Sequence, residues 1–123
     1  MGPWDVEFTN EFGEWWESLT PDEQNAIDIV VAMLEQAGPH LPFPYSTKIM
    51  SSRHGHLREL RVQHRGVPYR VLYAFDPRRV ALLLIGGTKA GDDRWYETYV
   101  PIADALYEEH LEELKEEGLL DGS

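Results

Sequence analysis

The sequence contains no cysteine, and this absence narrows the chemistry that the chain can perform. Without thiols there is no disulfide bond, no thiolate nucleophile and no zinc site built on cysteine. The chain also has no run of about 18 apolar residues, so no segment is predicted to span a membrane. Its first residues, MGPWDVEF, lack the basic and then apolar regions of a signal peptide. We therefore expect a cytoplasmic protein with no membrane partner.

Basic residues are missing from the first part of the chain and scarce in the last. Residues 1–44 hold nine acidic residues and no Lys or Arg, and residues 90–123 hold eleven acids against two bases, so each block has a net charge of -9. Residues 45–89 hold nine bases against two acids, which gives this block a net charge of +7. Phosphate contact needs local positive charge, so the pattern predicts one anion-binding site in an otherwise acidic protein.

The length and composition predict a single folded domain. The chain has 123 residues, of which 42% are hydrophobic and 11% aromatic, enough to build one core. We place the domain at residues 4–117 and expect residues 118–123 to be a frayed tail.

The first half of the chain is predicted to contain one strand and two helices. Alternating apolar residues predict a strand over 4–8, and helical spacing predicts a helix over 10–19 with Asn10 as its N-cap. Thr20, Pro21 and Glu23 form a capping-box pattern at the start of a second helix, which we expect to end before Gly38 and Pro39. Residues 39–56 contain three prolines and are predicted to be irregular.

The second half is predicted to contain three strands and a helix. The strands are expected at 57–64, 67–75 and 80–85, the last of them apolar enough to be covered on both faces. Helical spacing follows through Ile102, Leu106, Leu111 and Leu114. The predicted order is β-α-α-β-β-β-α, an α+β fold with a mainly antiparallel sheet packed against helices.

Four stretches in order resemble the RelE/ParE superfamily of toxins from bacterial type II toxin–antitoxin modules, most closely the HigB-like, phage-derived branch. They are WDVEFTNEFGEWWESL, SSRHGHLRELRVQHRGVPYRVLYAFDP, VALLLIGGTKAGDDRWYE and PIADALYEEHLEEL. The resemblance implies a RelE-like fold and an mRNA interferase, an endoribonuclease that cleaves mRNA on the ribosome without a metal or cofactor and so inhibits translation. It also implies a cognate antitoxin, typically with a helix-turn-helix DNA-binding domain.

Other functions remain open at this point. The ParE branch of the same fold poisons DNA gyrase, so a non-enzymatic toxin that binds a protein target is one alternative. A weak homologue that only binds an antitoxin or regulator is another. Fold similarity alone does not decide between them.

Five residues are predicted to carry the cleavage chemistry. Arg70 in PYRVLY matches the strand arginine that contacts the scissile phosphate in RelE-like toxins, and it should face away from Tyr69 and Val71. The resemblance also implies roles for Arg58 and Arg61, because RelE-like toxins carry basic residues in this strand. A separation of three places these two arginines on opposite faces of an ideal strand. Lys89 follows the last strand, and Tyr96 has the spacing of a catalytic tyrosine in some relatives, with Tyr99 as its competitor. The competing structural interpretations are that the arginines are solvated or form ion pairs at the rim of the sheet, and that the tyrosine only packs.

A second group is predicted to contact RNA. These residues are Lys48, Arg53, His54, His56 and His64. The histidines titrate near neutral pH and are also candidates for acid–base catalysis. No third ligand is apparent beside His54 and His56, so we predict no metal site; solvated loop positions are the competing interpretation for all five.

One departure from the family pattern weakens the ribosomal interpretation. Many relatives carry further Lys or Arg after the position of Lys89, but this chain has Asp92, Asp93 and Glu97 there. Acidic side chains repel the rRNA backbone. This stretch favours the alternatives in which the protein is feeble or serves another purpose.

Overall fold

The computed structural model describes residues 2–119, and these form a five-stranded sheet with three α-helices. In chain order the elements are β1 (Val6–Phe8), α1 (Asn10–Glu17), α2 (Pro21–Ala37), the 3₁₀ turn η1 (Gly38–His40), β2 (Ser46–Lys48), β3 (Arg58–His64), β4 (Val67–Phe75), β5 (Ala81–Thr88) and α3 (Trp95–Glu116). The predicted tail lies partly outside this range, at residues 120–123. The first two residues of that predicted tail, Gly118 and Leu119, donate backbone hydrogen bonds to the end of α3.

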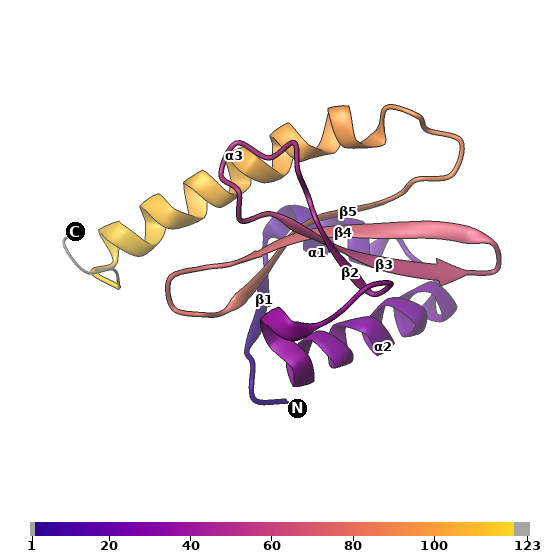
Figure 1. Ribbon diagram of the computed structural model, residues 1–123, viewed down its shortest axis with the longest axis horizontal. Helices are drawn as coiled ribbons and strands as arrows, with labels where there is room; N and C mark the ends of the chain where they lie inside the picture. Colours follow the sequence, from indigo (N-terminus) through magenta and orange to yellow (C-terminus); the bar gives the residue numbers. More distant parts are fainter. Residues whose placement is uncertain (1, 120–123) are drawn as a thin grey trace.

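The sheet has the order β1-β5-β4-β3-β2, and only the pairing of β1 with β5 is parallel. Figure 1 shows α3 along one face of the sheet and α2 along the other. Each face has its own core. Tyr69, Val71 and Tyr73 of β4 pack with α1 and α2, while Leu72 and Ala74 pack with α3. This alternation confirms the predicted α+β fold with a mainly antiparallel sheet.

The helix starts follow from local side chains. Thr20 caps α2 as predicted, because its hydroxyl accepts from the Glu23 amide while the Glu23 carboxylate accepts from the Thr20 amide. The prediction that Asn10 caps α1 is wrong. Thr9 is the cap: its hydroxyl accepts from the Phe12 amide and donates to the Leu84 carbonyl of β5.

Several elements differ from their predicted bounds; for example, β1 begins at Val6 and not at residue 4, and α1 ends at Glu17 and not at residue 19. Residues 39–56 contain the short strand β2, which has little sequence signal of its own and is held by pairing with β3. Strand β5 continues through Gly86 and Gly87 to Thr88. Glycine is needed at both positions, because a β-carbon would lie 2.2 Å from the Trp15 ring at Gly86 and 2.9 Å from Trp95 Nε1 at Gly87. Helix α3 begins at Trp95 and contains the predicted helical spacing from Ile102 to Leu114, although the Ile102 side chain is exposed.

Candidate functional site

Arg61 and Arg70 lie opposite each other on neighbouring strands. They are register partners in the β3–β4 ladder and share the sheet face that α3 covers. Tyr69 and Val71 occupy the other face, so the predicted direction of Arg70 is as expected. Its environment is not that of a solvated strand arginine, because Arg70 is only 7% exposed.

Glu59 joins these arginines to α3. Its Oε1 accepts a hydrogen bond of 2.6 Å from the Tyr96 hydroxyl and lies 3.3 Å from Arg70 Nε. Its Oε2 accepts from the Thr47 hydroxyl at 2.5 Å and lies 3.6 Å from Arg61 Nη1. The carboxylate is 5% exposed. Side chains from β2, β3, β4 and α3 therefore converge on one buried anion.

The guanidinium of Arg70 has few partners for a buried cation. Its Nη1 donates to the Tyr69 carbonyl at 3.0 Å. Its Nε is within ion-pair distance of Glu59 but is poorly aligned, and within residues 2–119 this buried atom has no hydrogen-bond partner. A buried donor without an acceptor is costly, and it marks a place that a ligand can occupy.

Tyr96 and Lys89 extend the site beyond the two arginines. The Lys89 ammonium lies 5.4 Å from the centre of the Tyr96 ring, and the Lys89 amide donates to the Pro68 carbonyl. Burial, together with the hydrogen bond to Glu59, raises the pKa of Tyr96 above its ordinary value. The tyrosine thus keeps its proton at neutral pH. Tyr99, its predicted competitor, stacks on Trp95 with ring centres 4.7 Å apart.

A groove of about 530 Å³ opens beside the arginines at the free end of β3. Arg61, Arg70 and His64 are its charged or titratable lining residues, and α2 supplies an apolar wall. Phe43, which is 70% exposed, lies under the Arg61 guanidinium at 5.7 Å, and Tyr45 also lines the groove. A basic groove with exposed aromatic rings has the chemistry to hold phosphates and stack bases.

Several predicted residues lie elsewhere. Arg58 is on the opposite sheet face, as its spacing from Arg61 implies, and its Nε donates to Ser46 Oγ. Exposed Lys48 is its register partner on β2.

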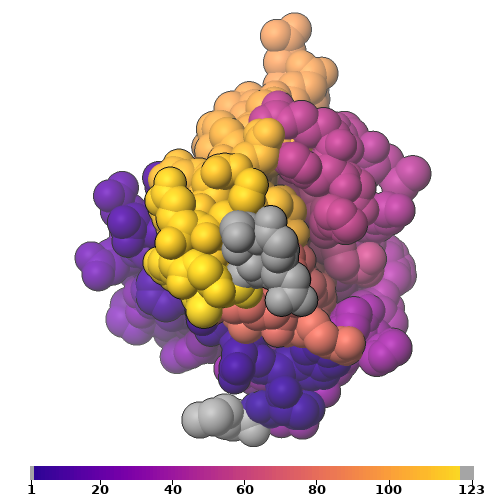
Figure 2. Space-filling view, turned by 90° about the vertical axis from the view of Figure 1, so that its left-hand side faces the viewer, coloured from indigo at the N-terminus to yellow at the C-terminus, as the bar shows by residue number. Residues whose placement is uncertain are grey.

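Three more predicted residues pack against the later turns of α3. Arg53 forms an ion pair with Glu108, and His54 and His56 pack edge-on or tilted against Tyr107. Figure 2 shows this segment beside α3. Tyr107 is eleven residues beyond Tyr96, roughly 16 Å along the helix. These three side chains are therefore not part of the Arg70 cluster.

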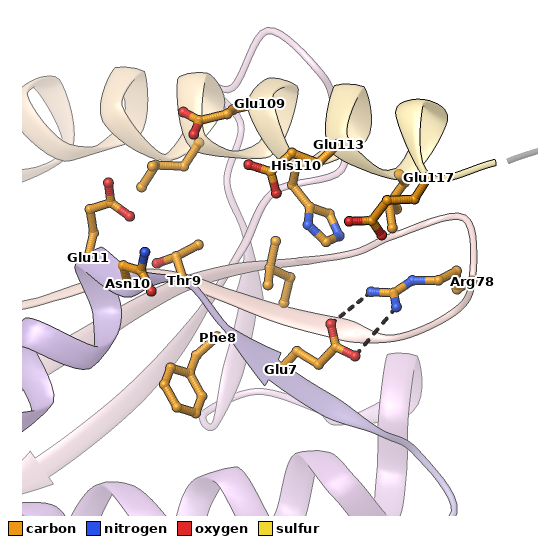
Figure 3. Close-up of a pocket in the computed structure, with 13 residues that line it drawn as sticks. Glu7, Phe8, Thr9, Asn10, Glu11, Arg78, Glu109, His110, Glu113 and Glu117 are labelled. Carbon is orange, nitrogen blue, oxygen red and sulfur yellow. Dashed lines mark hydrogen bonds and ion pairs between the residues drawn. The ribbon is translucent and has the colours of Figure 1, made fainter. Parts of the chain in front are cut away.

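A second cavity, of about 320 Å³, lies between β1 and α3 and has the opposite charge. Glu7, Glu109, Glu113 and Glu117 are among its lining residues, and Figure 3 shows Arg78 paired with Glu7 at its side. Its acidic lining does not suit a phosphate.

Two kinds of structural feature are absent from residues 2–119. These residues contain no group of three or more His, Asp or Glu side chains arranged to hold a metal ion. They also contain no helix that is both long and apolar enough to cross a membrane.

Two residues important to the site were not selected from the sequence. These residues are Glu59 and Thr47. Glu59 is one of only two acids in the basic block 45–89, and that isolation was the available signal.

Comparison with known proteins identifies relatives that match most of the chain. The family model "Phage derived protein Gp49-like" matches residues 14–108. HigB3 of Mycobacterium tuberculosis, which carries the name of a toxin, is 40% identical over 98 residues that cover 79% of this chain and 84% of HigB3. HigB2 of the same organism, also named as a toxin, is 34% identical over 104 residues, 83% of this chain but 52% of HigB2.

One solved structure supports the fold. The archaeal RelE–RelB complex from Pyrococcus horikoshii matches with a TM-score of 0.52 and 19% sequence identity, over 72% of this chain and 97% of the matched chain. At this identity the likeness concerns the fold alone. The predicted RelE-like fold is confirmed.

Proposed function

Because the chain belongs to the Gp49-like family together with HigB-type toxins, we propose that it is the toxin of a type II toxin–antitoxin module and that it cleaves mRNA on the ribosome. The observation that carries this proposal is the convergence of Arg61, Arg70 and Tyr96 beside a basic groove. These three residues come from three separate elements. Cations and a protonated hydroxyl at one place are the groups that metal-independent RNA cleavage uses.

The reaction is a transfer within the RNA. The 2′-oxygen attacks the adjacent phosphorus, the bond from phosphorus to the 5′-oxygen breaks, and a 2′,3′-cyclic phosphate and a 5′-hydroxyl result. One group accepts the proton of the 2′-hydroxyl and another donates a proton to the leaving 5′-oxygen. Fixed cations stabilise the charge that develops on the phosphate.

The residues divide among these roles. Arg70 and Arg61 are the cations at the phosphate, and Lys89 adds a third at the end of β5. Tyr96 is the proton donor, because its hydroxyl is protonated and lies beside Arg70 at Glu59. Of the three predicted histidines, His64 is the one that lines the groove, but it packs on Tyr69, on the opposite sheet face from Arg70, so we assign no residue to the 2′-hydroxyl proton.

We also propose a cognate antitoxin as the protein partner, with a helix-turn-helix domain as the branch implies. A toxin of this kind needs an inhibitor in the cell that makes it. The basic groove is the natural target of an acidic segment, because such a segment would both neutralise Arg61 and block RNA.

A second function has one observation in its favour. Asp92, Asp93 and Glu97 are exposed at the start of α3, next to Lys89. Their charge opposes docking on rRNA, and it suits a toxin or weak homologue that acts by binding a protein.

The deciding experiment is a reconstituted translation reaction with a defined mRNA. Primer extension would map cuts after addition of the purified protein, with and without ribosomes. Cuts that require translation and disappear with Arg70→Ala support the proposal. Intact mRNA together with arrested growth on expression would favour the protein-binding alternative.

A further inference from the structure

Glu59 is surrounded by hydroxyl donors and cations that come from four different elements. Two hydroxyls donate to it, those of Tyr96 and Thr47, and two guanidinium groups flank it, those of Arg61 and Arg70. A carboxylate and a phosphodiester each present two equivalent oxygens that share one negative charge. The groups that surround Glu59 are therefore the same groups that would bind an RNA phosphate.

Arg70 shows the complementary shortage. It is buried, its Nε has no hydrogen-bond acceptor within the described residues, and its ion pair with Glu59 is misaligned. A cation in this state gains from an anion that reaches its open donors. Glu59 is attached to β3 and cannot satisfy Arg70 and Arg61 equally well, whereas a mobile phosphate is free to do so.

The proton of Tyr96 is engaged by the same carboxylate. The tyrosine hydroxyl donates to Glu59 Oε1 at 2.6 Å. A proton donor for the leaving 5′-oxygen has to be released from that bond before it can act. The arrangement in the structure is thus closed to chemistry at both Arg70 and Tyr96.

We propose that Glu59 is a positioning residue that occupies the place of the scissile phosphate in the free protein, and that RNA binding displaces it from Arg70 and Tyr96. The inference rests on the proposed function for the identity of the ligand. In the free protein, Glu59 holds the arginines and the tyrosine in register and offsets their charge. When the phosphate enters, Thr47 remains to hydrogen-bond the displaced carboxylate.

The test measures affinity for an uncleavable ligand. A 12-nucleotide 2′-O-methyl RNA carrying a fluorophore is titrated with the full-length protein, and fluorescence anisotropy reports the dissociation constant. Glu59→Gln removes the competing charge and keeps the side-chain shape, so we expect binding to tighten on the order of tenfold. Glu97→Gln is the matched control, because it removes one exposed charge near the same end of α3 and should change affinity by less than about threefold. Equal affinity of the Glu59→Gln and Glu97→Gln variants, or weaker binding by Glu59→Gln, overturns the proposal.

A second measurement needs no variant that perturbs the buried pair. Glu59→Gln leaves Arg70 without a counter-ion and can destabilise the fold. The ¹⁵N resonances of the arginine Nε groups are therefore recorded for the wild-type protein during the same titration. Displacement of Glu59 predicts that the Arg70 Nε signal shifts in proportion to bound oligonucleotide. An Arg70 signal that stays fixed while the oligonucleotide saturates the protein contradicts the proposal.

The two proposals fail separately. Cleavage of translated mRNA by the wild-type protein, with no gain in affinity from Glu59→Gln, retains the nuclease and rejects the role of Glu59. No cleavage, with a clear gain in affinity, rejects the nuclease and retains Glu59 as a competitor for phosphate.

Discussion

The two acids of the basic block each meet an arginine, and the two pairs are built differently. Asp76 is 4% exposed and holds Arg78 through two hydrogen bonds, from Nε at 3.0 Å and from Nη2 at 2.7 Å. Arg78 then pairs with Glu7, and Asp76 also accepts from His110 at 2.8 Å. Glu59 and Arg70 are buried to about the same extent as Asp76, yet no hydrogen bond of good geometry joins Glu59 to Arg70.

This difference separates an anchor from a binding site. The Asp76 pair ties the β4–β5 turn to β1 and α3, and its bonds are satisfied internally. The Glu59 pair leaves donor capacity on Arg70, and it faces a groove with exposed aromatic rings. Native proteins rarely leave a buried cation under-bonded, and active sites are where they do so.

The largest expected difference between the two ion pairs appears when the arginine of each pair is replaced by alanine. Arg70→Ala should lower the rate of mRNA cleavage by about 10²–10³, because transition-state charge stabilisation is lost. Arg78→Ala should leave the rate per folded molecule within about twofold, since Arg78 lies at the far end of β4. Mapped cleavage in reconstituted translation, normalised to folded protein by circular dichroism, measures both. Equal losses in the two variants would mean that Arg70 acts through stability.

A smaller loss of cleavage is expected when Tyr96, at the Glu59 site, is replaced. Tyr96→Phe removes the proton donor, so cleavage should fall by about 10² while affinity for the uncleavable oligonucleotide changes little. Tyr99→Phe is the control, because Tyr99 stacks on Trp95 and its hydroxyl has no proposed role. Full activity of the Tyr96→Phe variant would remove the tyrosine from the chemistry.

The anchor should respond in stability and not in cleavage. Burial alone raises the pKa of Asp76, but hydrogen bonds from Arg78, His110 and the Val80 amide outweigh it and hold the pKa below its ordinary value. Asp76→Asn should lower the free energy of unfolding by about 2–3 kcal/mol at pH 7, because it leaves Arg78 without its main counter-ion. Urea titrations followed by tryptophan fluorescence measure the loss.

The pH dependence of that loss has a definite sign. A group whose pKa is lowered by folding stabilises the protein above its unfolded pKa, about 4 for aspartate, and the contribution disappears as the pH falls through the folded pKa. The gap between wild type and Asp76→Asn should therefore narrow below pH of about 4. A difference in unfolding free energy that is the same at pH 7 and pH 3 would show that shape and not charge is responsible.

Glu7→Gln, at the exposed end of the network, should lower the free energy of unfolding by less than about 1 kcal/mol.

The sequence predicted more of the fold than of the site. The bounds of α2 and β4 were as predicted, because Thr20 caps the one and alternating apolar residues mark the other. The strand β2 was missed, since STK has no periodicity and exists through its pairing with β3. Resemblance selects Arg70 and Lys89, but the burial of Arg70 depends on how α3 packs over β4, and local spacing does not show that packing.

Glu59 illustrates why a site is harder to predict than a strand. Its neighbours in the site are Thr47, Arg61, Arg70 and Tyr96, and Tyr96 lies 37 residues from Glu59 in the chain. Local spacing shows that Glu59 lies on the same strand face as Arg61. Only the β3–β4 register and the path of the chain from β5 to α3 bring Arg70 and Tyr96 to it.

The smallest expected effect is that of Lys89→Gln on oligonucleotide binding, and it tests whether the binding site extends to Lys89. Lys89 is half-buried, its ammonium lies over the Tyr96 ring, and its neighbours in sequence are acidic at Asp92 and Asp93. If Lys89 contacts a phosphate, Lys89→Gln should weaken oligonucleotide binding several-fold and reduce the slope of log affinity against log salt by about 0.7, the value for one single-strand contact. Anisotropy titrations at several salt concentrations measure that slope. Lys115→Gln is the control at the other end of α3, where the lysine lies 3.9 Å from Glu112, and its slope should equal that of the wild type. If Lys89→Gln also leaves the slope unchanged, the lysine only orients Tyr96, and the cationic site ends at Arg61 and Arg70.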